Sequence, residues 1–348
     1  MKPSGLVTVA QLADYQEIID VRTPAEYAED HIPGAINCPV LSDEERVRVG
    51  TLYKQVSPFE AKKVGAALIA INIARHLQER FHDRPKEWHP LIYCWRGGQR
   101  SGAMQIIFRQ IGWRADKLEG GYKAYRGQVL ETLETLPQRY TYQVLCGPTG
   151  SAKTRVLQAI GRQGGQILDL ETLAAHKGSV LGPLPGEAQP AQKGFDTLMW
   201  QSLQALDPSR PVYVEAESRT IGRLRLPAAL VDAMRASACV QIDASLDARV
   251  DYLLRDYAYF PADPDWLRTR LACLKDLVGG ETLALWNGFI DHQAWTELVR
   301  DLLARHYDPH YQRSQNRNYA GFQQPRSLET DDLSDAGIER LAAAILAG

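Results

Sequence analysis

The stretch "HPLIYCWRGGQRSGAMQIIFRQIG", residues 89 to 112, places a short apolar run, a glycine-rich loop and an amphipathic segment in that order. The apolar run 89–94 predicts a buried strand that ends at Cys94, and the segment 101–112 has the apolar spacing of a helix. Other short apolar runs, among them 17–22, also alternate with helical stretches. Because such alternation is typical of parallel sheets, we expect a parallel sheet whose ligands bind beyond the carboxyl ends of its strands.

The same order of elements recurs in "YTYQVLCGPTGSAKTRVLQAIGRQ", residues 140 to 163. Its apolar start predicts a strand, its glycines predict a loop, and the segment 153–163 has helical spacing. The Gly- and Pro-rich segment 178–195 predicts a loop over this second site. The chain after about residue 245 has mostly helical spacing. Further strands are predicted at 165–170, 211–217 and 238–244.

The length of 348 residues favours two domains, because a single hydrophobic core seldom extends past roughly 250 to 300 residues. The restart of the strand, loop and helix pattern at residue 140 places the boundary just before it. We predict an α/β fold with an N-terminal parallel-sheet domain, a helical linker around Pro137, and a C-terminal P-loop domain with a helical C-terminal region. The predicted bounds are 1–128, 129–139 and 140–348.

Composition is that of an ordinary soluble protein, with 45% apolar and 24% charged residues. Residues 1–16 lack the charged and apolar regions of a secretory signal, and the apolar segment 64–74 is too short to cross a bilayer. We therefore expect a cytoplasmic protein with no membrane attachment. The net charge of −2 predicts that any nucleic-acid surface is a local basic patch.

The five cysteines are scattered, without a CxxC pair or a cluster with histidine. This spacing predicts neither a disulfide framework nor a structural zinc site. We interpret Cys38, Cys239 and Cys273 as small buried hydrophobic residues, and Cys146 as a packing residue at the end of a strand. Only Cys94 has reactive surroundings.

Cys94 stands where its strand ends, with Arg96 and Arg100 close by in the sequence. A thiolate is the reactive form of cysteine, and backbone N–H groups, a helix N-terminus and nearby arginine all favour that anion. Gly97 and Gly98 permit backbone angles that turn the loop amides inward, toward the sulfur and a bound oxyanion. We predict that Cys94 is catalytic, and the alternative is a cysteine that is merely buried in a loop.

Together with the stretches 20–40 and 112–126, the cysteine loop resembles the rhodanese family over the whole predicted first domain. The resemblance implies a rhodanese-like fold in which Cys94 is the nucleophile that carries sulfur or selenium.

The spacing in this loop departs from the common sulfurtransferase pattern, because Gln99 stands where a basic residue is usual. The Cys-x5-Arg spacing instead resembles the rhodanese-fold phosphatases, although Tyr93 stands where those enzymes usually have histidine. A longer loop suits a tetrahedral phosphorus group, so we expect selenophosphate or thiophosphate as the donor. The predicted donor-binding residues are Arg96, Gly97, Gly98 and Arg100.

The segment "GPTGSAKT", residues 147 to 154, has the G-x4-G-K-[ST] spacing of a phosphate loop. Backbone N–H groups from Gly150 to Lys153 would surround phosphate oxygens at a helix N-terminus. Ala152 replaces the last glycine of the common pattern. The Thr154 hydroxyl is the usual Mg²⁺ ligand of such loops, and no tightly bound cofactor is predicted. The predicted phosphate- or diphosphate-binding residues are Gly147, Gly150, Ser151, Lys153 and Thr154.

An acidic partner for this loop is expected at the end of a later strand, where Glu215 and Glu217 face the same way at strand spacing. We predict that Glu215 is the metal ligand or base, with Glu217 second. The alternative is a pair of solvated carboxylates on an edge strand. No N-K-x-D guanine signature is visible, and nothing requires that the phosphate ligand be a nucleotide.

Two segments supply basic residues for a nucleic-acid surface: the chain directly after Glu217, and the segment 305–322. The segment 305–322 interleaves arginine, histidine and tyrosine, a mixture that suits single-stranded or loop RNA. On composition alone, a solvated helix end explains it equally well. The predicted tRNA-binding residues are Arg219, Arg223, Arg313 and Arg317.

The pairing of these two domains, with the segments 50–77, 176–182 and 212–222, resembles the tRNA 2-selenouridine synthase family over nearly the full length. The resemblance implies an enzyme that replaces the sulfur of 2-thiouridine at the tRNA wobble position by selenium from selenophosphate. In that family the sulfur is first alkylated by geranyl diphosphate, which the phosphate loop would bind. The implied partners are tRNA and a supplier of selenophosphate.

Two other classes of function stay open at this point. The chain is alternatively an ATP-dependent tRNA sulfurtransferase, in which the phosphate loop activates a base and a Cys94 persulfide delivers sulfur. A third reading is a non-enzymatic module that senses a nucleotide, and its activity would not depend on Cys94.

Overall fold

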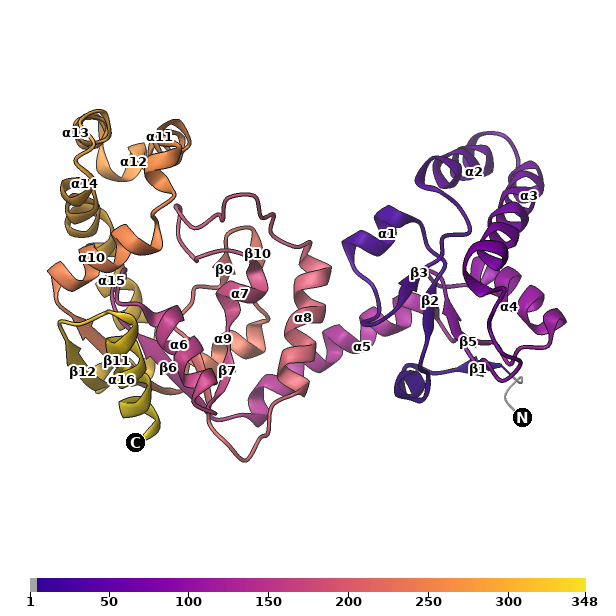
Figure 1. Ribbon diagram of the computed structural model, residues 1–348, viewed down its shortest axis with the longest axis horizontal. Coiled ribbons are helices and arrows are strands. Elements are labelled where there is room, and N and C mark those ends of the chain that lie inside the picture. The colour runs from indigo at the N-terminus through magenta and orange to yellow at the C-terminus, as the bar shows by residue number, and fades with distance from the viewer. Residues whose placement is uncertain (1–4) are drawn as a thin grey trace. The chain divides into compact units, whose positions relative to one another are not determined.

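The structure is a computed structural model that describes residues 5–348, apart from the side chains of residues 312 and 314–316. It divides into two compact units, Met1–Thr132 and Leu133–Gly348, and α5 (Gly121–Thr135) runs through the division (Figure 1). The first four residues, on which part of the expectation about a secretory signal rests, lie outside the described residues.

The N-terminal unit is built on a five-stranded sheet in the order β1-β5-β4-β2-β3, and every neighbouring pair is parallel. The predicted parallel sheet is therefore confirmed. Asp20 pairs with Tyr93, so the chain that follows β4 leaves the sheet at its carboxyl edge. The strands are β1 (Leu6–Val7), β2 (Ile18–Asp20), β3 (Ile36–Asn37), β4 (Leu91–Tyr93) and β5 (Asp116–Leu118).

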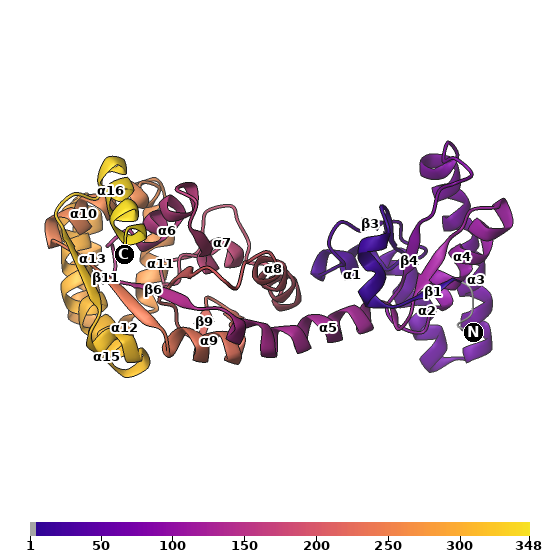
Figure 2. The ribbon, with the colours of Figure 1, turned by 90° about the horizontal axis from the view of Figure 1, so that it is seen from below.

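Helices cover both faces of this sheet, with α3 and α4 on one face and α1 and α5 on the other (Figures 1 and 2). Ile73 of α3 and Phe108 of α4 are buried against Ile92 of β4, which fixes α4 directly behind the cysteine loop. Thr23 and Ser42 cap α1 and α2 by accepting hydrogen bonds from the third residue of each helix. The remaining bounds are α1 (Pro24–Glu29), α2 (Asp43–Gln55), α3 (Pro58–His76) with a π-helical extension (Leu77–Phe81), and α4 (Gln99–Ile111).

The C-terminal unit contains a second parallel sheet, in the order β12-β11-β6-β8-β7. Because β6 and β8 are both interior and adjacent, the loops that follow them open at the same edge of the sheet. A short antiparallel pair, β9 (Thr220–Ile221) with β10 (Leu224–Arg225), stands apart from this sheet. The main strands are β6 (Tyr142–Cys146), β7 (Gln166–Leu168), β8 (Val212–Glu215), β11 (Ala238–Ala244) and β12 (Arg326–Thr330).

Helices α6 and α16 share one hydrophobic core with this sheet, in which Val156 and Ile160 of α6 meet Ile338 and Leu341 of α16. The polar faces of these helices point outward, as expected for amphipathic helices on a sheet. The helices around the sheet are α6 (Lys153–Arg162), α7 (Leu170–Ala174), α8 (Gln192–Gln204), α9 (Ala228–Arg235) and α16 (Asp335–Leu346).

The expected helical C-terminal region packs around its own core, in which Trp286 is fully buried beside Leu271 and Leu302. Its one departure from expectation is β12, an edge strand inside a region predicted to be helical. The helices are α10 (Leu246–Asp256), α11 (Pro264–Ala272), α12 (Lys275–Val278), α13 (Gly280–Asp291), α14 (Trp295–Leu302), a π-helical turn (Leu303–Tyr307) and α15 (Asp308–Asn318).

Four of the five free cysteines are buried. Cys273 is exposed, so the interpretation of this residue as a buried hydrophobe is wrong: it lies at the solvent-facing end of α11. Among residues 5–348, no helix combines the length and apolar character needed to cross a membrane.

Candidate functional site

The first site lies where β4 ends in the N-terminal unit. Cys94 follows the last residue of β4, and Gly98 adopts a left-handed φ of 79° directly before α4. This backbone angle favours glycine, whereas the nearest side-chain atom, Lys117 Nζ, belongs to a flexible chain that could move aside. The predicted turn of the loop is therefore present, and it brings the first residues of α4 back toward the cysteine.

The Cys94 side chain is buried, yet it lines a cavity of about 940 Å³. The same cavity is lined by the loop residues up to Arg100 and by side chains of α2 and α3, among them Tyr53 and Lys62. Cys94 is thus buried in its loop, as the alternative interpretation has it, and a cavity opens beside it, as a catalytic role requires.

Ser101 was not predicted as part of this site. Its hydroxyl lies 3.4 Å from Cys94 Sγ and can donate a hydrogen bond to the sulfur, which stabilises negative charge there. Its position in the first turn of a helix that follows a cysteine loop is the signal that sequence reasoning could have used.

The two arginines of the loop have different surroundings. Arg96 is exposed and lines the cavity. Arg100 instead forms a bidentate ion pair with Glu26, with N···O distances of 2.6 and 3.2 Å. Burial raises the pKa of Glu26, but the hydrogen bond and charge of Arg100 outweigh it and lower that pKa below its usual value. Arg100 thus lines the cavity while its guanidinium is held by a carboxylate, which differs from the free anion ligand that the spacing suggested.

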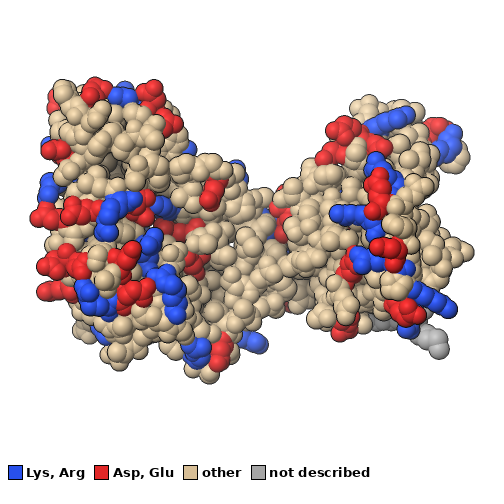
Figure 3. Space-filling model, in the orientation of Figure 1, with Lys and Arg blue, Asp and Glu red and all other residues tan. Residues whose placement is uncertain are grey.

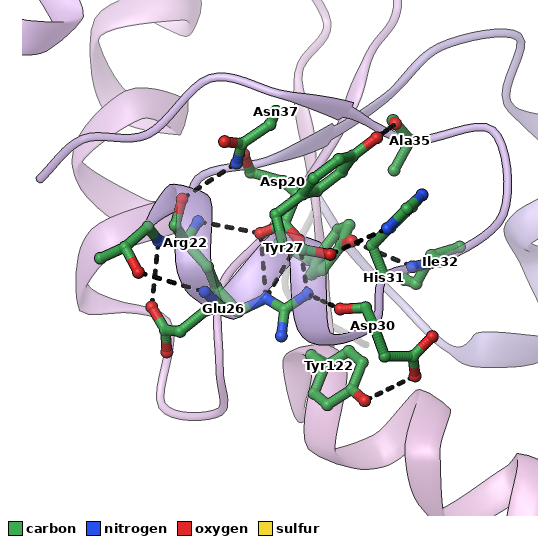
Figure 4. A network of polar contacts seen from close by, with 12 residues as sticks. Asp20, Arg22, Glu26, Tyr27, Asp30, His31, Ile32, Ala35, Asn37 and Tyr122 are labelled. Atoms are coloured by element: carbon green, nitrogen blue, oxygen red, sulfur yellow. Dashed lines mark hydrogen bonds and ion pairs between the residues drawn. The ribbon is translucent and has the colours of Figure 1, made fainter. Parts of the chain in front are cut away.

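A buried polar network centred on Arg22 joins Asp20, Asp30 and Tyr122 (Figure 4). The Arg22 guanidinium binds the Asp20 carboxylate at 2.6 Å and the Asp30 carbonyl at 2.7 Å, and it lies 4.0 Å from the centre of the Tyr122 ring. The Tyr122 hydroxyl donates to Asp30 at 2.6 Å, and its backbone N–H donates to the Cys94 carbonyl at 2.8 Å. The network therefore fixes the start of α5, which in turn fixes the position of Cys94.

The second site lies where β6 ends in the C-terminal unit. Gly147, Gly150 and Ala152 all have positive φ, of 151°, 86° and 58°, and α6 begins at Lys153. A Cβ atom at Gly150 would lie 2.8 Å from the Leu253 side chain, so only glycine fits there without displacement. The predicted strand, glycine loop and helix are confirmed as structure.

Lys153 and Thr154 lie at the start of α6 and line one cavity of about 420 Å³. The Lys153 ammonium lies 2.7 Å from the Gly147 carbonyl, so it curls back over its own loop. The Ser151 hydroxyl is buried and has no partner among the described residues. An anion bound in this loop would meet that hydroxyl, the Lys153 ammonium and the N-terminal amides of α6.

Three carboxylates gather beside Thr154. Oxygen atoms of Glu171, Glu215 and Glu217 all lie within 4.8 Å of one another. Glu215 and Glu217 were predicted, whereas Glu171 at the start of α7 was not. Because β8 lies between β6 and β7 and Glu215 is 1% exposed, the alternative of solvated carboxylates on an edge strand is wrong.

The electrostatics of this cluster favour a bound cation or extra protons. Burial raises the pKa of Glu171 to about 7 and that of Glu217 to about 8. The pKa of Glu215 is also raised, first by burial and second by the negative charge of Glu171. The Thr154 hydroxyl lies 2.9 Å from both Glu171 and Glu215, although its single proton serves only one of them.

The loop predicted to cover this site is confirmed at its first residues. Gly178 has a φ of 65°, and a Cβ atom there would lie 2.9 Å from carboxylate oxygens of both Glu171 and Glu217. Lys177 is held by Asp256 at 2.6 Å and lies 4.2 Å from the centre of the Tyr257 ring. The loop therefore closes one side of the carboxylate cluster.

The four arginines predicted to contact tRNA are exposed. Arg223 donates to the Gln189 carbonyl at 2.6 Å and is thereby fixed on the β9–β10 turn. On the face of the C-terminal unit drawn in Figure 3, basic and acidic side chains are intermingled. In the same unit, Arg155 is paired with Asp335 and Arg162 with Glu339. The exposed arginines are Arg219 and Arg223 beside β9 and Arg313 and Arg317 on α15.

The tyrosines of the segment 305–322 are engaged inside the unit. The Tyr311 hydroxyl accepts a hydrogen bond from the Gly147 N–H, and the Tyr319 hydroxyl donates to the Glu217 carbonyl at 2.8 Å. The first contact attaches α15 to the phosphate loop, and the second attaches the chain after α15 to the segment that follows β8. The structure therefore gives no support to a role for these two rings in stacking on RNA.

Comparison with known proteins matches both units. A family model for the rhodanese-like domain matches residues 8–128, and one for the tRNA 2-selenouridine synthase AAA domain matches residues 140–263. A tRNA 2-selenouridine synthase of Nitrosomonas europaea is 36% identical over 245 residues, and one of Nitrosomonas eutropha is 37% identical over 245 residues. The enzyme of the same name from Alcanivorax borkumensis is 33% identical over 326 residues.

These alignments cover different shares of each chain. The two Nitrosomonas alignments cover 69% of this chain and 63% and 62% of those proteins, a little under two thirds of their length. The Alcanivorax alignment covers 84% of this chain and 88% of that protein, so the similarity extends over both units.

Proposed function

This chain belongs to the tRNA 2-selenouridine synthase family, and we propose that it replaces the sulfur of 2-thiouridine at the tRNA wobble position by selenium. The observation that carries the proposal is the open cavity beside Cys94 in one unit, together with the phosphate loop and carboxylate cluster in the other. A cytoplasmic enzyme with tRNA and a selenophosphate supplier as its partners fits this function.

The phosphate loop would bind the diphosphate of geranyl diphosphate. The sulfur of 2-thiouridine attacks the first carbon of the geranyl chain, the new S–C bond forms as the C–O bond breaks, and pyrophosphate leaves. Lys153 and the amides at the start of α6 stabilise the charge that develops on the departing diphosphate. In the geranylated nucleoside the sulfur departs as a thiol, which is a far better leaving group than a thiocarbonyl sulfur.

The residues around Thr154 fit a divalent cation such as Mg²⁺. Glu215 Oε1 is buried and has no partner among the described residues, and the shared Thr154 hydroxyl cannot donate to both neighbouring carboxylates. Thr154, Glu171, Glu215 and Glu217 would hold the ion. When bound, it would supply a positive charge that neutralises the diphosphate.

The Cys94 loop would handle selenophosphate. Arg96 and the amides of Gly97 and Gly98 would bind its phosphate oxygens, with Arg100 fixed nearby by Glu26. Selenium then bonds to the carbon that carried sulfur, the geranyl thiol leaves, and hydrolysis releases the phosphate. Whether selenium passes through a covalent adduct on Cys94 is decided by mass spectrometry of the intact protein after incubation with selenophosphate.

The division of labour between the units is tested with two variants. We expect Cys94→Ser to abolish selenation and leave geranylation intact, and Lys153→Ala to lower the geranylation rate at least tenfold, an effect of about 1.4 kcal/mol. Mass spectrometry of tRNA incubated with geranyl diphosphate and selenophosphate measures both products. Cys273→Ser and Lys275→Ala, both exposed, are the matched controls. Loss of both activities in each folded variant would contradict the assignment.

A second candidate is an ATP-dependent tRNA sulfurtransferase. The observation in its favour is that a lysine and a threonine at the start of a helix, facing a buried glutamate, serve a nucleoside triphosphate with Mg²⁺ equally well. ATP hydrolysis that depends on thiouridine-free tRNA, with a persulfide on Cys94, would establish this function instead.

A further inference from the structure

A mainly apolar cavity of about 280 Å³ adjoins the phosphate-loop cavity within the C-terminal unit. Thr149, Ser179, Leu253 and Tyr257 line both cavities and so form their common rim. Beyond this rim the walls come from α10, α11 and α14 and from the π-helical turn after α14. We call this space the tail cavity; its deeper walls include Leu254, Leu267, Val299, Leu302 and Leu303.

The two adjoining cavities have opposite chemistry. One holds the phosphate-loop amides, Lys153 and the carboxylates, whereas the other is lined by aliphatic and aromatic side chains with few hydroxyl groups. A nucleoside base placed in the tail cavity would lose its hydrogen bonds to water, at a cost of roughly 1–3 kcal/mol for each unpaired polar group. A ligand that fits both cavities therefore has a phosphate head and a short hydrocarbon tail.

We propose that the tail cavity holds the hydrocarbon chain of geranyl diphosphate, an assignment that rests on the function proposed above. A protein cavity of about 150 Å³ accepts the six carbons of benzene, so a cavity of about 280 Å³ matches a chain of roughly ten carbons. The first carbon of the chain then lies at the common rim, between the diphosphate and the tail. Chain length is set by the depth of the tail cavity.

The rim is fixed by contacts that the structure shows. The Tyr257 ring packs against the Lys177 ammonium, and Lys177 is bound by Asp256. Gly150 meets Leu253 so closely that a Cβ atom would lie 2.8 Å from it, which ties the phosphate loop to α10. Helix α10 thus lines both the phosphate-loop cavity and the tail cavity, which defines the distance between the diphosphate and the hydrocarbon chain.

The test changes the depth of the tail cavity at Val299, a half-buried residue of α14. Binding of inorganic pyrophosphate and of dimethylallyl, geranyl and farnesyl diphosphates, with five, ten and fifteen carbons, is measured by calorimetry in the presence of Mg²⁺. We expect Val299→Trp to weaken geranyl diphosphate at least tenfold while pyrophosphate and the five-carbon compound keep their affinity. Val299→Ala should shift the ratio of farnesyl to geranyl affinity at least threefold toward farnesyl.

The control is Leu285→Trp, which adds the same ring at an exposed position on α13. Should Val299→Trp fail to fold, the Val299→Ala ratio decides alone. If geranyl diphosphate binds wild type tightly but neither variant changes the order of chain lengths, the tail cavity is not the site and the proposed function stands. If wild type binds no prenyl diphosphate more tightly than pyrophosphate, geranylation at this loop is refuted and the tail assignment fails with it.

Discussion

The phosphate loop tolerates Ala152 at the position where the usual pattern has glycine. The left-handed conformation costs an alanine roughly 1–2 kcal/mol, and its φ of 58° lies in that region. The Ala152 methyl is buried in the core between the sheet and α6, which returns about 0.8 kcal/mol. The strain is therefore partly offset by packing, and the loop keeps its shape without the glycine.

Replacing Gly150 or Gly164 by alanine distinguishes the free-energy cost of a left-handed backbone angle from the cost of a steric contact. Both have a left-handed φ, 86° and 89°, but an added Cβ meets Leu253 at 2.8 Å at Gly150 and nothing within 4 Å at Gly164. We expect Gly164→Ala to lower the free energy of unfolding by about 1 kcal/mol, and Gly150→Ala by at least about 1 kcal/mol more. Urea unfolding of the full chain, with the C-terminal unit followed by hydrogen exchange, measures the difference. Equal losses would show that Leu253 moves aside freely.

At the scale of elements, the carboxylate cluster is assembled by neighbouring parallel strands. Glu171 follows β7 and Glu215 ends β8, and both reach the Thr154 hydroxyl at the start of α6. The sequence alone does not predict this contact, since Thr154 and Glu215 are 61 residues apart. Once β7 and β8 are paired, the acidic residues at their ends have to converge.

This cluster should make stability fall as the pH rises. Burial raises the pKa of Glu171 to about 7 and that of Glu217 to about 8, so the folded unit retains protons that the unfolded chain releases above about 4.5. The stabilisation that these retained protons contribute is therefore fully present below about pH 4.5. It is lost progressively as the pH rises to about 8. Thermal unfolding in EDTA should show this fall, and Mg²⁺ should oppose it most at high pH. Glu171→Gln should reduce the pH dependence, whereas Glu297→Gln, at an exposed position, should not.

The Tyr311 hydroxyl attaches helix α15 to the phosphate loop. The Tyr311 hydroxyl accepts from the Gly147 N–H, and Tyr311→Phe would leave that amide without its partner. We expect a loss of about 1–3 kcal/mol in unfolding free energy, by urea titration. Tyr259→Phe is the control, because its buried hydroxyl has no partner among the described residues and its loss should be neutral or stabilising. A neutral Tyr311→Phe would mean that water replaces the contact.

The sequence predicted those features that are local. The Cys94 loop and the segment 147–154 are contiguous, so strand, glycines and helix could be recognised without the fold. Contacts that depend on the fold escaped prediction: Ser101 is seven residues from Cys94 and reaches it only because the loop turns, whereas Arg100 and Glu26 join α4 to α1 across 74 residues. Strand β12 escaped because five residues between helices give a weak alternating pattern, and only its pairing with β11 defines it.

For the whole molecule, charge limits how the proposed tRNA substrate can be bound. A net charge of −2 gives little long-range attraction for a polyanion, and on the face in Figure 3 opposite charges are interleaved. We therefore expect the proposed tRNA binding to depend on a few exposed arginines whose charge is not neutralised by a neighbouring carboxylate. Arg162 illustrates the opposite case, since it lies 2.6 Å from Glu339.

Arg313 and Arg317 on α15 allow a test of whether exposed arginines contact tRNA phosphates. Each phosphate contact in single-stranded nucleic acid contributes about 0.7 to the slope of log K against log salt concentration. We expect the double change Arg313→Ala and Arg317→Ala to lower that slope by about 1.4 and to weaken tRNA binding at low salt, as measured by filter binding. Arg162→Ala removes the same kind of charge from an ion pair on the same unit and should leave the slope unchanged, because Glu339 already neutralises it. An unchanged slope in the double variant would show that α15 does not touch tRNA, and Arg219 and Arg223 beside β9 would then be the arginines to replace.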